Sequence, residues 1–155
     1  MSDSPHDHDR IAGYLTVMSV FGSALAGTVL VGRLRGERLP SSYALADLAL
    51  GALATHKFAR LITKDGVTTP LRAPFTEFEE NTGSAEVAES PRPEPVRHVV
   101  GELITCPFCV APWIASGYVA LLALAPPVAR AWAAVFSIVA GSDFLQHAYA
   151  HVRTD

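Results

Sequence analysis

Residues 11–32 read IAGYLTVMSVFGSALAGTVLVG, and no side chain in this stretch is charged. A helix of about 20 apolar residues crosses the hydrocarbon core of a bilayer, so the stretch predicts a membrane-spanning helix. The composition agrees, because half of the 155 residues are hydrophobic and only 17% are charged, against about 25% in soluble domains. The sequence therefore predicts an integral membrane protein with one domain.

Three further segments are apolar enough to be interpreted as membrane helices. Together with the first, the predicted helices cover residues 11–32, 43–62, 109–125 and 128–150. Pro126 and Pro127 leave only a short turn between the last two helices, which therefore form an antiparallel pair. We expect an all-α fold, a four-transmembrane-helix up-down bundle over residues 11–155, preceded by a polar N-terminal tail at 1–10.

The long connection at 63–108 is rich in glutamate and proline within residues 76–98. Such a composition cannot bury a core, so we expect this acidic part to be disordered. It would then serve either as a solvated tether or as an acidic docking strand. The stretch before it is broken by Pro70 and Pro74, and it is either an interfacial segment or a structured loop.

The up-down topology places the starts of helices one and three and the ends of helices two and four on one side. That side holds most of the ionisable and metal-binding residue types near the predicted helix ends: His56, Lys57, Arg60, Cys106, Cys109, Asp143 and His147. An acid inside a spanning helix is costly and is normally paired, so we expect Asp143 to pair with Arg60 or Lys57. Such a pair is either a structural lock between two helices or part of a proton or ion relay.

Cys106 and Cys109 are the only cysteines, and they form a Cys-Pro-Phe-Cys motif at the start of the third predicted helix. Two cysteines at this spacing can form a disulfide or bind one metal ion together. The helix dipole favours their thiolate form. Three interpretations stay open: a structural turn, a catalytic redox pair, or a zinc site that His56 and His147 would complete.

Several short motifs in the chain resemble those of a known family. They are Arg60-Leu61-Ile62-Thr63-Lys64-Asp65, Val67-Thr68, Pro70-Leu71-Arg72-Ala73-Pro74-Phe75, Gly101-Glu102-Leu103, Cys106-Pro107-Phe108-Cys109, Pro112-Trp113 and Ser142-Asp143-Phe144-Leu145. Over residues 43–150 the chain resembles the bacterial membrane family called domain of unknown function 1360 (DUF1360). The resemblance implies a multi-helix membrane protein related to a small sporulation-associated protein, and it implies no established activity.

We expect a membrane scaffold or interaction protein rather than an enzyme. The alternatives are a membrane thiol-disulfide oxidoreductase that uses Cys106 and Cys109, and a metal- or ion-handling protein, with zinc as the only cofactor considered. The expected partners are the lipid bilayer and another membrane protein, and a net charge of −3 argues against nucleic acid. More basic residues flank the cysteine-bearing end than the other, which places that end in the cytoplasm of a bacterial cell.

Overall fold

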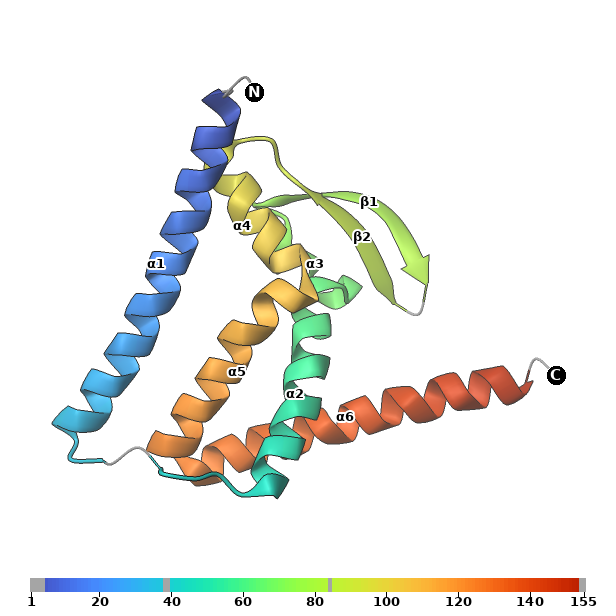
Figure 1. Ribbon diagram of the computed structural model, residues 1–155. Helices are drawn as coiled ribbons and strands as arrows, with labels where there is room; N and C mark the ends of the chain where they lie inside the picture. The colour runs from blue at the N-terminus through green and yellow to red at the C-terminus, as the bar shows by residue number, and fades with distance from the viewer. Residues whose placement is uncertain (1–4, 38–39, 84, 154–155) are drawn as a thin grey trace.

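The computed structural model of the protein describes residues 5–37, 40–83 and 85–153, with side chains from residue 11 onward. These residues form six α-helices, one 3-10 turn and a two-stranded sheet, which Figure 1 shows. The helices are α1 (Pro5–Leu34), α2 (Leu45–Thr63), α3 (Thr69–Arg72), α4 (Pro95–Thr105), α5 (Pro107–Leu124) and α6 (Pro126–Arg153), and the strands are β1 (Thr76–Gly83) and β2 (Glu86–Pro91). Of the predicted tail, residues 1–4 lie outside the described part of the chain, and α1 already begins at Pro5.

Three of these helices are long and apolar enough to cross a membrane, namely α1 over residues Ile11–Leu34, α5 and α6. Most of their apolar side chains face outward, and only 6% of the apolar stretch of α1 is buried. Leu15, Met18 and Ile138 are each more than half exposed. A water-soluble surface does not carry contiguous apolar area on this scale. The three helices therefore suggest membrane association.

The second predicted span, at 43–62, is where the four-span prediction is wrong. It forms α2, which is not among the helices apolar enough to span, since charged side chains lie near both of its ends. Those charges have partners on α6: Asp47 pairs with Arg130 at 2.9 Å, and Lys57 pairs with Asp143 at 3.0 Å. The two pairs join α2 to α6 at two points, one near each end of α2.

The core lies where α2, α5 and α6 meet. Ala54 of α2 and Ala133 of α6 have no exposed surface, and such small side chains let two helices approach closely. Tyr118 of α5 packs over Gly51 and donates its hydroxyl hydrogen to the backbone oxygen of Asp47 at 2.9 Å. The aromatic side chains around this contact are Phe58, Trp132 and Phe136.

Within the stretch 76–98, which was predicted to be disordered, the described residues 76–83 and 85–98 instead contain the two strands of the β1–β2 hairpin and the start of α4, so the all-α prediction is wrong here. The strands are antiparallel, with Thr76 opposite Pro91. Gly83 has a positive φ of 94° at the tip, a conformation that glycine adopts without steric cost. Thr76 and Val87 are buried while the rest of β1 is exposed. The hairpin is thus anchored at a few points rather than by a broad apolar face.

Gly51→Ala should destabilise the bundle, because the added Cβ would overlap the Tyr118 ring, which its hydrogen bond to α2 holds in place. Overpacking a tight core costs about 1–3 kcal/mol. Gly22→Ala in α1 is the matched control, since a Cβ at Gly22 meets nothing within 4 Å and alanine favours a helix over glycine by about 1 kcal/mol. Thermal unfolding in detergent compares the two variants, and equal melting temperatures would contradict the packing of α2 against α5.

Candidate functional site

We use the name cap for residues 64–83 and 85–105, which comprise α3, the hairpin and α4 and adjoin the end of α2 (Figure 1). At its centre lies Arg72, whose side chain is 1% exposed. Its guanidinium donates to both carboxylate oxygens of Glu89, from Nε at 2.6 Å and from Nη2 at 3.1 Å. The carboxylate is equally buried, at 2%. The cap is therefore built around a buried, bidentate ion pair.

The guanidinium of Arg72 also donates to acceptors besides Glu89. Nη1 donates to the backbone oxygen of Ile62 at 2.6 Å and Nη2 to that of Asp65 at 3.2 Å, so the arginine also binds the last turn of α2. The hydroxyls of Thr68 and Thr69 accept at 2.6 and 3.3 Å. Such complete pairing allows a charge to be buried. The proline-broken segment before the hairpin thus takes the form of a structured loop, one of its two predicted forms.

Glu89 remains charged in this setting. Burial raises the pKa of Glu89, but hydrogen bonds from Arg72 and Thr76 outweigh burial and hold the pKa below its ordinary value of 4.5. Thr76 lies at the start of β1 and donates to the carboxylate at 3.0 Å. Both strands are therefore tied to the arginine through one carboxylate, which is ionised at neutral pH.

A polar cleft of about 790 Å³ lies between the end of α2, the tip of the hairpin and α6. Lys57 bridges Asp65 at 3.3 Å and Asp143 at 3.0 Å, and it thereby links the cap to α6. Arg60 lines the same cleft and binds both carboxylate oxygens of Glu86 at 2.6 Å. The predicted Asp143–Arg60 pair is not formed, because the hairpin brings Glu86 to the arginine. Of the two bases considered for Asp143, the lysine makes the contact.

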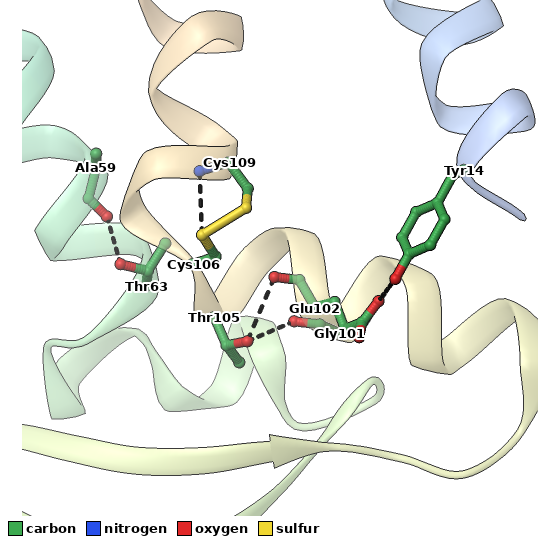
Figure 2. The surroundings of a disulfide bond; sticks show 8 residues. All are labelled: Tyr14, Ala59, Thr63, Gly101, Glu102, Thr105, Cys106 and Cys109. Carbon is green, nitrogen blue, oxygen red and sulfur yellow. Dashed lines mark hydrogen bonds between the residues drawn. A yellow bond between two sulfur atoms is a disulfide. The ribbon is translucent and has the colours of Figure 1, made fainter. Parts of the chain in front are cut away.

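The cysteine motif forms the junction of α4 and α5, which Figure 2 shows. Cys106 is the one residue between the two helices, and its sulfur accepts a hydrogen bond from the backbone N–H of Cys109 at 3.2 Å. The two sulfurs form a disulfide, with the Cα atoms 5.2 Å apart. Cys109 is exposed, and the neighbouring Phe108 is 86% exposed. The pair is therefore a surface disulfide at the N-terminus of a helix.

The four ligands predicted for zinc do not form one site. His56 and His147 line the polar cleft, whereas Cys106 and Cys109 lie at the start of α5 and do not line it. Both sulfurs are also bonded to each other. Within the described ranges, no group of three His, Cys, Asp or Glu side chains is placed to hold a metal ion. The cleft thus unites the predicted residues of α2 and α6, and the cysteines form a separate site.

Sequence reasoning missed three carboxylates of this region as partners: Asp65, Glu86 and Glu89. Two of them lie in the segment that was predicted to be disordered, where acidic residues count only as solvated charge. One signal could have pointed to them. Arg60 and Arg72 precede the glutamate-rich segment in the sequence, and such basic residues are candidate partners for its carboxylates.

Comparisons with known proteins identify relatives but no activity. A family model described as a protein of unknown function (DUF1360) matches residues 50–149, which run from α2 into α6, and this confirms the resemblance seen in the motifs. A relative from Bacillus subtilis (strain 168), named sporulation protein YjcA, is 32% identical over 97 residues, which make up 61% of this chain and 81% of the relative. No solved structure matches the chain.

Arg72→Met should unfold the cap, because Glu89 would stay buried without its counter-charge. Breaking a buried pair in this way costs about 3–5 kcal/mol. Arg92→Met is the matched control, since Arg92 pairs with Glu77 at the surface and exposed pairs contribute about 0–1 kcal/mol. Hydrogen exchange of the strand amides compares the variants. Equal protection of the hairpin in both would refute the central role of Arg72.

The hairpin should also lose stability as the pH falls below about 4.5. Because the folded-state pKa of Glu89 lies below its ordinary 4.5, its ionisation stabilises the folded cap fully above that value, and the stabilisation is lost as the pH falls through the folded-state pKa. Hydrogen exchange of β1 and β2 across this pH range measures the loss. The control is Glu89→Gln, because glutamine has no proton to gain at this position. Acid should therefore increase hydrogen exchange of the hairpin less in this variant than in the wild type. An equal increase in both would exclude Glu89 as the cause.

Proposed function

Because the chain belongs to the DUF1360 family, which is described as being of unknown function, we propose its function from geometry: a multi-pass membrane protein whose cap is a binding surface for a second protein. The observation that carries the proposal is the hairpin, which a buried ion pair fixes in place while one strand stays exposed. A simple tether between helices would need no such anchor. The apolar helices would hold the surface at the bilayer.

The two edges of the hairpin differ in access. The edge formed by β2 lies against α4, where a Cβ added to Gly101 would come within 2.9 Å of the Cβ of Pro91. β1 pairs only with β2 in the described part of the chain, and all its residues after Thr76 are exposed. An open strand edge offers backbone N–H and C=O groups to another chain. We therefore assign the binding surface to β1.

The open strand is acidic and carries an aromatic side chain. Glu77, Glu79 and Glu80 are exposed, and Phe78 among them is 57% exposed. The complementary partner is an extended segment of another protein, rich in lysine or arginine, that adds a strand to β1. Backbone pairing would supply affinity, and the glutamates would select the sign of the partner's charge. This is the acidic docking strand considered from the sequence, in an ordered form.

We propose that the cap faces away from the cytoplasm, opposite to the orientation predicted from the total of basic residues. Disulfides persist in oxidising compartments, and the bond between Cys106 and Cys109 adjoins the cap. Around the first helix, the arginines after residue 32 also outnumber the one before residue 11, and this favours an external N-terminus. The binding partner is then a protein exposed outside the cytoplasm.

A photoreactive amino acid in place of Phe78 tests the binding surface in native membranes. It should cross-link to a second protein through a basic segment that mass spectrometry can identify. The yield should fall at high salt and after combined Glu77→Gln, Glu79→Gln and Glu80→Gln, because salt and charge removal both weaken exposed charge pairs. The matched control carries the same group in place of Val96, which is 76% exposed on α4 rather than on the strand.

Two results would overturn the proposal. One is cross-linking that is equal from positions 78 and 96, since the contact would then not involve the strand. The other is a yield from position 78 that is unchanged when the three glutamates are neutralised, since the partner would then not be selected by charge.

A further inference from the structure

We propose that Cys106 and Cys109 form a thiol-disulfide exchange site that accepts two electrons from a dithiol on another protein or peptide. The site lies at the junction of α4 and α5, apart from the open strand. It therefore goes beyond the binding surface and does not depend on it. Three features of the junction support the proposal: the turn does not need the disulfide, one sulfur is accessible, and the other is suited to leave as a thiolate.

The turn that the disulfide closes is already fixed by the backbone. The N–H groups of Cys109 and Val110 both donate to the carbonyl oxygen of Cys106 at 3.1 Å. A disulfide stabilises a protein mainly by constraining a loop, and the gain is smallest for short loops. A bond between residues three apart, within an ordered helical turn, therefore adds little as a staple. This favours a chemical role for the pair over the structural turn.

The disulfide is open to attack at one of its two sulfurs. Cys109 is exposed, whereas Cys106 is partly buried between the two helices. Phe108, which is 86% exposed, gives an incoming peptide an apolar surface beside the bond. A substrate thiolate therefore meets the sulfur of Cys109.

Cys106 is placed to be the leaving sulfur. It accepts the N–H of Cys109 at 3.2 Å, and it occupies the N-cap of the 18-residue helix α5. The helix dipole favours negative charge at that position. Exchange is faster when the leaving thiol is stabilised as its thiolate. The geometry thus assigns different roles to the two cysteines.

The reaction consists of two exchange steps. A substrate thiolate bonds to the sulfur of Cys109, the bond between the two cysteines breaks, and Cys106 leaves as a thiolate. The second substrate thiolate then attacks the substrate sulfur of this mixed disulfide and expels Cys109. The substrate dithiol becomes a disulfide, its two electrons reduce the protein's disulfide to a dithiol, and its two protons pass through water to the released thiolates. A low-molecular-weight disulfide restores the starting bond by the same steps in reverse.

A single-turnover measurement tests this chemistry. The oxidised full-length chain in detergent is mixed with a reduced synthetic peptide that carries two cysteines, and acid-quenched products are counted by mass spectrometry. We expect up to one peptide disulfide per protein molecule, and none from the variant with both cysteines changed to serine. A protein disulfide that stays intact in a hundredfold excess of reduced peptide would overturn the proposal.

Two single variants separate the assigned roles. Cys109→Ser leaves only the thiol of Cys106, and Cys106→Ser leaves only that of Cys109. The rate of alkylation by iodoacetamide is measured against pH for each variant, with circular dichroism to confirm that both keep their helices. The midpoint for Cys106 should lie at least about one pH unit below that for Cys109, because only Cys106 holds the N-cap position. Equal midpoints would refute Cys106 as the leaving sulfur.

Discussion

The buried pair of Arg72 and Glu89 is the interaction on which the cap depends. A two-stranded hairpin alone is marginally stable in water, and this one buries only a few apolar side chains, such as Val87. The arginine supplies what apolar burial does not, because it joins the last turn of α2, the loop that follows it and both strands in one hydrogen-bonded network. Three of these contacts are made by Arg72 itself, and the fourth joins Thr76 to the carboxylate that Arg72 holds. The network thereby anchors the base of the hairpin to the end of α2.

α2 connects this cap to the apolar helices. Its middle packs closely against α5 and α6 through Gly51 and Ala54, while paired charges lie toward its ends. Unpaired charges would be costly against lipid, so a helix of this kind is stable where protein surrounds it and supplies counter-charges. The lysine near its end belongs to both parts of the molecule, since Lys57 contacts Asp65 of the cap and Asp143 of α6. The polar cleft lies where these contacts meet.

Sequence reasoning predicted the features that depend on local composition. It failed where residues far apart in the sequence pair with one another and thereby determine the structure. The uncharged run at 11–32, the helix boundary at Pro126 and the family motifs are local, and each was recognised. The disorder predicted for 76–98 was wrong because its glutamates were counted as solvated, although Arg60 and Arg72 neutralise two of them. The same omission left Arg60 available as a partner for Asp143, although Arg60 pairs with Glu86. The span predicted at 43–62 was wrong for another reason, because α2 carries charged side chains near both ends. Zinc ligands were inferred from a shared side of the bundle, but sharing a side does not bring side chains within bonding distance.

The spacing of partners along the chain has a consequence for biogenesis. The ion pairs Arg72–Glu89, within the cap, and Arg60–Glu86, between α2 and the cap, join residues 17 and 26 positions apart. They can form soon after the hairpin leaves the ribosome, because the loop-closure entropy is small. The contacts of Asp47 with Tyr118 and Arg130 span 71 and 83 positions. During synthesis, α2 therefore has to wait with an unneutralised carboxylate until α6 is made. Synthesis of the first turns of α6 then supplies the counter-charge, and a chain truncated before Arg130 would keep the Tyr118 contact to α2 but would leave the Asp47 carboxylate without Arg130.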